Sequence, residues 1–173
     1  MKYGAARGAV TGLPASLLRL HRHGLSHLLV TGGTHDERLA IARRFHRASP
    51  LSRESFLALD CVRHEGRLVR ALEAWLLESG LPPSAEFELG ASVLYLDPIS
   101  ALSQSTQRLL LMLAHRMQGT DGQPLASGPR RLMAGDRAHL ARGAHADAMC
   151  PALVDHLDKI RIELTVAGKR GVA

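Results

Sequence analysis

Two short segments of the chain hold residues whose types and spacing could bind a nucleotide phosphate. Gly32, Gly33 and Thr34 follow the apolar run LSHLLV and precede a helical pattern that contains Arg38, and Asp97 ends the apolar run in ASVLYLDPI. A glycine turn between a strand and a helix directs backbone N–H groups at phosphate, and an aspartate at a strand end can hold magnesium. The pattern therefore outlines a phosphate-binding site.

The same loop also holds residues that oppose this chemistry. His35, Asp36 and Glu37 stand where further glycines and a lysine are expected, and two carboxylates beside the loop repel phosphate. Acidic residues also suit the first turn of a helix, where they complement the helix dipole. A plain alternative stays open, in which Gly32-Gly33 is only a turn between strand and helix.

Apolar periodicity predicts the elements that position these residues. Short apolar runs predict strands, and apolar residues at helical spacing predict helices between them. We expect helices at 14–23, 37–48, 64–79 and 104–118, and strands at 25–30, 55–61, 91–99, 129–135 and 159–166. This alternation predicts an α/β fold, a three-layer αβα sandwich on a mostly parallel sheet. Ligands of such folds bind at the carboxyl ends of the strands, where both segments are expected.

Composition narrows the class of protein. The chain has 173 residues, about the length of one domain, and it contains two cysteines. No apolar run reaches the roughly 20 residues of a membrane helix, and the first residues lack the apolar core of a secretory signal. We therefore expect a soluble, cytoplasmic protein. The net charge of +6 favours an acidic partner such as nucleic acid, but six aromatic residues leave little for base stacking.

Four blocks of the sequence resemble one family at matched spacing. The blocks are GGTHDERLAIARRFH, the segment from Ser49 to Cys61, VLYLDPISALSQSTQRLLLML, and RRLMAGDRAHL with the later DHLDKIRIEL. Together they resemble the AAA+ domain of sigma-54-dependent transcriptional activators over residues 12–164. The resemblance implies a P-loop NTPase (AAA+)-like fold for a single degenerate domain, residues 1–164. Residues 165–173 then form a short basic tail, and the family's α-helical lid domain is expected to be missing.

The departures from that family fall on its phosphate and magnesium chemistry. His35 and Glu37 take the two later glycine positions of the phosphate loop, and Arg38 replaces its lysine. Asp97 matches the magnesium-binding aspartate, but Pro98 takes the place of the glutamate that orients water. The resemblance therefore implies a vestigial phosphate loop and a vestigial acidic motif. An anion could still be attracted by Arg38, through a different geometry.

Three further family positions are changed as well. Arg137 aligns with the sensor asparagine, and Cys150 and His156 align with the two arginine fingers. An arginine finger contributes roughly 10³ to 10⁵ in rate, so its loss removes hydrolysis. We expect no catalytic residue, no cofactor and no bound ATP or magnesium. The hairpin that contacts the sigma factor also has no counterpart between 62 and 90.

These observations predict a catalytically inactive AAA+-like protein that acts through protein–protein contact in transcriptional regulation. Its expected partner is an AAA+ activator or the sigma factor machinery, and a homo-oligomer is the other arrangement considered. Two alternatives remain: a basic protein associated with nucleic acid, and a nucleotide binder that does not hydrolyse. Each alternative makes a separate prediction, salt-dependent binding for the first and thermal stabilisation by nucleotide for the second.

Other polar clusters have simpler interpretations. Two groups of residues contain histidines at close spacing. The first is His21, His23 and His27, and the second is His145, Asp147, Cys150, Asp155 and His156. Neither group fits a zinc spacing, so no metal is expected. Cys61 and Trp75 are expected in the core. The arginines of the densest basic run are expected on a solvated helix face, with an anionic partner as the second interpretation; they are Arg43, Arg44, Arg47 and Arg53.

Overall fold

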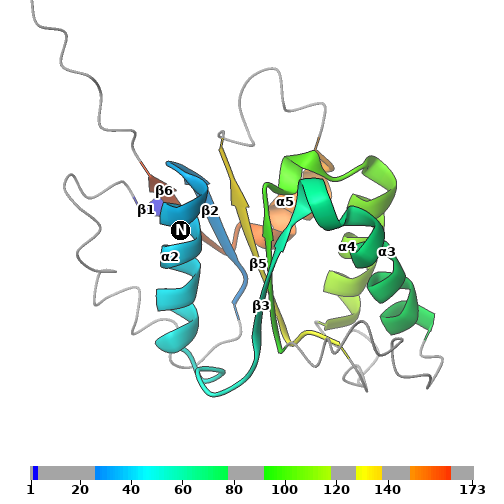
Figure 1. Cartoon of the computed structure of the whole chain (residues 1–173), viewed down its shortest axis with the longest axis horizontal. Helices are drawn as coiled ribbons and strands as arrows, with labels where there is room; N and C mark the ends of the chain where they lie inside the picture. Colours follow the sequence, from blue (N-terminus) through cyan, green and yellow to red (C-terminus); the bar gives the residue numbers. More distant parts are fainter. Residues whose placement is uncertain (1, 4–25, 78–91, 118–127, 138–148, 165–173) are drawn as a thin grey trace, which may run out of the picture.

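A six-stranded parallel sheet forms the centre of the computed structural model, which describes residues 2–3, 26–77, 92–117, 128–137 and 149–164. The strand order is β1-β6-β2-β5-β4-β3, and every recorded strand pairing is parallel. Helices lie on both sides of this sheet, as Figure 1 shows. The three-layer α/β architecture expected from the alternating pattern is therefore confirmed.

The strands are short, and the central ones are buried on both faces. Their bounds are β1 Lys2–Tyr3, β2 Leu28–Gly32, β3 Phe56–Asp60, β4 Val93–Asp97, β5 Arg131–Asp136 and β6 Ile160–Leu164. β4 and β5 are buried at every position, which suits strands covered by helices on each side. Their nearly continuous apolar runs are therefore explained by position in the sheet.

Within the described residues, four helices cover the sheet unequally. They are α2 His35–Arg47, α3 Cys61–Leu77, α4 Gln104–Met117 and α5 Pro151–Leu157. A 3-10 turn, η1 Ile99–Ala101, leads from β4 into α4. Helix α2 lies on one face, and α3, α4 and α5 lie on the other (Figure 1).

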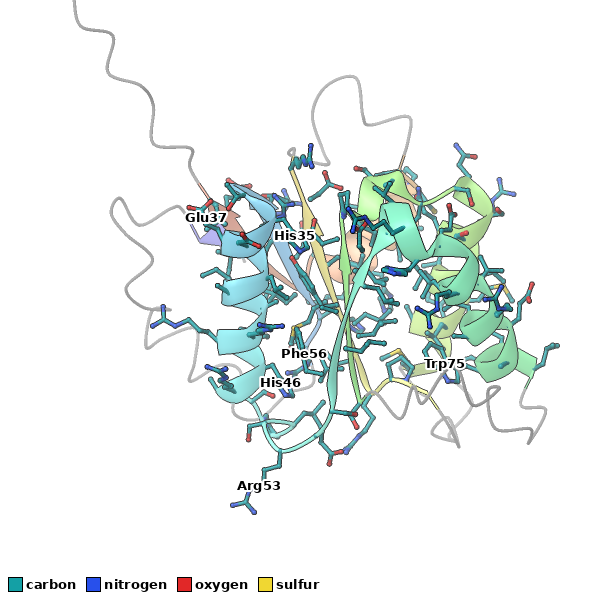
Figure 2. The ribbon with its side chains drawn as sticks, viewed as in Figure 1. His35, Glu37, His46, Arg53, Phe56 and Trp75 are labelled. Atoms are coloured by element: carbon teal, nitrogen blue, oxygen red, sulfur yellow. The ribbon has the colours of Figure 1, made fainter. Side chains whose placement is uncertain are left out.

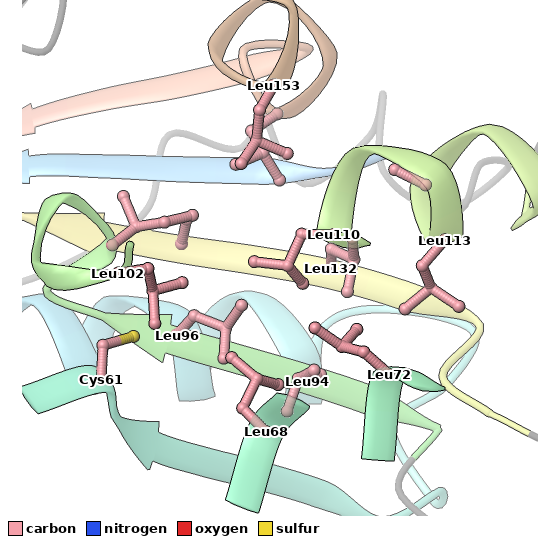
Figure 3. Close-up of a cluster of buried hydrophobic side chains, with 14 of the residues drawn as sticks. Cys61, Leu68, Leu72, Leu94, Leu96, Leu102, Leu110, Leu113, Leu132 and Leu153 are labelled. Carbon is pink, nitrogen blue, oxygen red and sulfur yellow. The ribbon is translucent and has the colours of Figure 1, made fainter. Parts of the chain in front are cut away.

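The larger core lies between the sheet and the three-helix side. Leu94, Leu96 and Leu132 from the strands meet Leu68 and Leu72 of α3, and all five are at most 1% exposed (Figure 3). Trp75 and Cys61 belong to this cluster, as expected. The smaller core, which includes Phe45, joins α2 to alternate residues of the same strands. Because side chains alternate along a strand, one sheet supplies both cores.

The predicted elements within the described residues match the structure apart from their ends. All eight of them are found with ends shifted by a few residues, including β2, which extends to Gly32. Strand β1 and helix α5 were not predicted as separate elements: β1 has two residues, and α5 has seven in a segment read as polar loop and helix. Both are too short to show a clear period. The predicted helix 14–23 lies outside the described residues.

Candidate functional site

The candidate site lies where the parallel strands end. Register pairs Asp60 with Asp97 and Thr31 with Asp136, so three carboxylates come to one edge of the sheet. Gly32 of β2 reaches the same edge beside Leu164 of β6. The loop at the end of β2 and the aspartate that ends β4 therefore meet, as the sequence predicted.

The turn after β2 needs glycine at two positions. Gly32 and Gly33 have φ angles of +78° and +59°, a backbone region that side chains disfavour. A Cβ atom on Gly32 would lie 2.2 Å from the carbonyl oxygen of Leu164. The loop is thus packed directly on β6. The alternative that Gly32-Gly33 serves as a structural turn is sufficient to explain both glycines.

The start of α2 is satisfied by its own carboxylate. Thr34 caps the helix, and the Glu37 carboxylate accepts hydrogen bonds from the Thr34 backbone N–H at 2.7 Å and from its hydroxyl at 3.0 Å. The hydrogen bond from the Thr34 backbone, followed by the one from its hydroxyl, lowers the pKa of Glu37, so the carboxylate is anionic near neutral pH. Figure 2 shows His35 and Glu37 at this end of α2. A negative group therefore already occupies the position where a phosphate would meet the helix N-terminus.

Arg38 turns back under the loop instead of facing solvent. Its Nη1 donates to the carbonyl oxygens of Gly32 at 3.0 Å and Gly33 at 2.9 Å. Its Nε and Nη2 donate to Asp97, with Nη2 2.8 Å from Oδ1. The arginine side chain is 1% exposed. Its charge is therefore buried and engaged by the protein, so an anion could reach Arg38 only if these contacts were broken.

Asp97 is the centre of this cluster. It is fully buried, and its carboxylate contacts Arg38, His35 Nδ1 at 2.9 Å and the hydroxyl of Tyr95 at 2.9 Å. Because a carboxylate only accepts, the contact with His35 places a proton on Nδ1. Both oxygens of Asp97 are thus used by neighbouring donors. A magnesium ion needs free carboxylate oxygens, so these contacts compete directly with it.

The pKa directions agree with this picture. Burial alone acts to lower the pKa of Arg38, but the hydrogen bonds and charge of Asp97 outweigh burial and raise it. Burial, aided by the charge of Asp97, raises the pKa of the Tyr95 hydroxyl above its usual range. These directions agree with an Arg38 guanidinium that is held in its charged form by Asp97 and with a Tyr95 hydroxyl that keeps its proton.

The other residues aligned with catalytic positions have structural roles. Pro98 precedes η1, where the N–H of Ser100 donates to Asp136 Oδ2 at 2.8 Å. Cys150 caps α5, and its N–H donates to Gln107 Oε1 at 2.6 Å. His156 is buried, 6% exposed, against His27. The structure does not bring Cys150 and His156 to the edge cluster.

No metal or membrane feature is found in the described part of the chain. Within those residues, no group of three or more histidine, cysteine, aspartate or glutamate side chains could hold a metal ion. His21, His23, His145 and Asp147 lie outside them. Among the described helices, none has the length and apolar character that a bilayer span requires. The arginines 43, 44, 47 and 53 are exposed, in agreement with a solvated face.

The α/β fold of the described residues is the fold that is seen in solved P-loop NTPase domains. Three solved structures support that class. NtrX from Brucella abortus in complex with ADP has a TM-score of 0.61 and a sequence identity of 16%, and the match covers 86% of this chain. NtrX in complex with ATP has a TM-score of 0.61 and a sequence identity of 17%, and the match covers 92% of this chain. The P-loop NTPase domain of the sigma-54 transport activator from E. coli has 0.55 at 14% and covers 87% of this chain.

The extents of these matches differ. The aligned part is 34% and 38% of the two NtrX chains, so the chain spans about a third of their length, and it is 98% of the E. coli domain. No family model matches the sequence, and no curated protein matches it significantly. The chain thus has the fold of a sigma-54 activator AAA+ domain, which confirms the fold that the resemblance implied.

Sequence reasoning missed three members of the edge cluster. Tyr95 lies two residues before Asp97, so strand periodicity alone places it on the same face. The sequence predicts that His35 blocks the tight phosphate-binding turn, and the structure shows its ring in contact with Asp97. Gly135 leaves room for both neighbours, since a Cβ there would lie 2.3 Å from the Tyr95 hydroxyl. That last requirement has no signal in the sequence pattern.

Proposed function

We propose that this chain is a catalytically inactive AAA+-like regulatory protein, which acts by protein–protein contact in transcriptional regulation. The observation that carries the proposal is the pair of Arg38 and Asp97, which engage each other at 2.8 Å while both are buried. A working site of this type keeps its cation free for phosphate and its aspartate free for magnesium. In this chain the two groups neutralise each other.

The inactivity follows from three contacts at separate points of the site. Glu37 supplies a carboxylate to the helix N-terminus, Arg38 supplies its guanidinium to the loop carbonyls, and Asp97 accepts from three side chains. Binding of a nucleotide would have to break each of these contacts and desolvate charged groups. Pro98 in addition offers no side chain to polarise water. Together these features support the absence of ATP turnover.

The regulatory role rests on the class of protein that shares this fold. The solved neighbours include NtrX and the P-loop NTPase domain of a sigma-54 transport activator, and an inactive copy of such a domain could join, block or titrate active subunits. Apolar side chains for such contact are exposed on α3 and α4: Val62 at 70%, Leu77 at 74% and Met112 at 54%. Among these, Met112 lies within α4, where a partner that covers this helix would bury it.

The proposal is tested by affinity capture from a nuclease-treated native lysate, with mass spectrometry of the captured proteins. We expect recovery of a sigma-54 activator or of the sigma factor itself, and reduced recovery with Met112→Glu. Ser105→Glu on the same exposed side of α4 is the matched control and should retain the partner. Capture of proteins unrelated to sigma-54 transcription contradicts the regulatory role. ATP turnover that disappears in Asp97→Asn contradicts the inactivity.

A second candidate function is favoured by one surface feature. Arg67 and Arg70 are exposed at the i, i+3 spacing of one face of α3, and Arg63 is exposed before the kink at His64. This basic surface can contact phosphates of a nucleic acid. If it does, affinity for duplex DNA falls steeply with salt, with a slope of about −0.9 for each phosphate contacted. A lack of DNA retention at about 0.1 M salt removes this candidate.

A further inference from the structure

Three histidines from different elements meet on the three-helix side of the sheet, away from the edge cluster. His27 directly precedes β2, His156 lies on α5 and His115 lies on α4. The Nε2 atoms of His27 and His156 are 3.2 Å apart, and both residues are only 6% exposed. The ring centroids of His115 and His156 are 5.6 Å apart, with His115 exposed at the surface.

The contact between His27 and His156 requires both rings to be neutral or to share a single added proton. His27 Nδ1 lies 3.2 Å from both the carbonyl oxygen and the backbone nitrogen of Leu132. In either neutral tautomer of His27, one ring nitrogen donates and the other accepts. Nδ1 can therefore bond one backbone group of Leu132 while Nε2 bonds His156. If both rings carry an added proton, two N–H donors face each other at Nε2 and the hydrogen bond is lost.

The groups around this pair make added charge more costly. Lys159 acts on both rings from the segment between α5 and β6, Arg131 acts on His27 from β5, and His115 acts on His156 from α4. None of these neighbours is a carboxylate. Burial first, then the charge of His156, lowers the pKa of His27 to about 4, and burial also lowers the pKa of His156.

The pair joins parts of the chain that are far apart in sequence. His27 and His156 are 129 residues apart, and α5 leads within three residues into β6, which pairs with β2. Helix α5 has only seven residues, so its place on the sheet rests on tertiary contacts: the buried side chains of Leu153, Val154 and Leu157, and the contact between His156 and His27. Loss of the histidine contact removes the polar part of this packing, next to α5 and the start of β6.

We propose that the His27–His156 contact is a pH-sensitive latch, which tightens the packing of α5 on the sheet beside the start of β6 when the rings are neutral and loosens it in acid. The geometry supplies the three parts that such a switch needs: a buried imidazole pair, cationic neighbours that oppose protonation, and a short element packed against the pair. The latch is independent of the phosphate loop and of the function proposed above.

Amide hydrogen exchange on the full chain tests the latch. Protection factors, corrected for the intrinsic effect of pH, are compared between about pH 7 and about pH 4.5 for α5 and β6 against α2. We expect protection in α5 and β6 to fall at least about tenfold, ahead of α2, because each unit of pKa difference is worth a factor of ten. The double variant His27→Asn/His156→Gln, which keeps polar amides without titrating, should lose this response.

Two controls keep the test decisive. His115→Gln removes the exposed neighbour and leaves the buried pair intact, so its α5 protection should still fall in acid. If the double variant does not fold at neutral pH, imidazole nitrogen NMR of the unaltered protein replaces it, and should show one donor and one acceptor at the two Nε2 atoms. An unchanged acid response in a folded double variant overturns the latch. So does independent titration of both rings near their ordinary pKa of about 6.5.

Discussion

Breaking the Arg38–Asp97 pair is the perturbation from which we expect the largest change in stability. Arg38→Met leaves the buried carboxylate of Asp97 with His35 and Tyr95 as its remaining partners, after the loss of contacts as short as 2.8 Å. Removing one partner of a buried ion pair costs about 3–5 kcal/mol, because the other charge stays buried. That is a large fraction of the roughly 5–15 kcal/mol that stabilises a typical domain.

A double-mutant cycle with Asp97→Asn isolates the interaction, with free energies of unfolding measured in urea. Since the second change removes the stranded charge, the double variant should be less destabilised than the sum of the single variants, by about 2 kcal/mol. The control is Arg63→Met, whose pair with Asp60 is exposed at 3.5 Å and should cost less than about 1 kcal/mol. Additive effects of the two single changes would contradict the interaction between Arg38 and Asp97. A loss of stability in Arg38→Met as small as that in Arg63→Met would contradict it as well.

Two further predictions concern the loop and the response to acid. In urea unfolding, Gly32→Ala should destabilise the protein by more than about 1 kcal/mol, because of the φ of +78° and the 2.2 Å approach of the new Cβ to the Leu164 carbonyl oxygen. The control is Gly66→Ala in α3, whose new Cβ meets no atom within 4 Å and should stabilise the protein by about 0.5–1 kcal/mol. Equal effects of the two changes would contradict the loop packing. The folded-state pKa of His27, about 4, is below its unfolded value of 6.5, so the stability from its neutral ring is fully present above about pH 6.5 and falls by about 3 kcal/mol as the pH drops below 4. Urea unfolding at several pH values measures this loss of stability. In His27→Asn the loss between neutral and acid pH should be smaller by about 3 kcal/mol, because the titrating ring is absent.

Much of the fold could be predicted because its signals are local. The run VLYLD is apolar enough to indicate a strand buried on both sides, and β4 is indeed buried throughout. Asp36 and Glu37 indicated the start of α2 through the helix dipole, and the helix begins at His35. These signals lie within a few residues of the elements they specify. Tertiary contacts then changed only the ends of the elements.

The role of the site residues could be predicted only in part, because it depends on contacts across the sheet. Replacement of the lysine by Arg38 indicated that the phosphate geometry was lost, but its burial did not follow from the sequence. Arg38 is 59 residues from Asp97, and their pairing requires β2 and β4 to end at one edge with β5 between them. The His27–His156 contact spans 129 residues and has no local signal at all.

The central claim, that the phosphate loop is closed by its own side chains, is tested most directly by calorimetric titration of the unaltered protein with Mg·ATP. We predict no saturable heat at millimolar nucleotide and no rise in melting temperature, whereas a true site at about 100 times its Kd would add about 2.7 kcal/mol of stability. The reason for this prediction is that Arg38 and Asp97 are paired with each other at 2.8 Å, and a nucleotide with its magnesium would have to break that pair. Saturable binding with a micromolar Kd, abolished by Arg38→Met, would contradict the account.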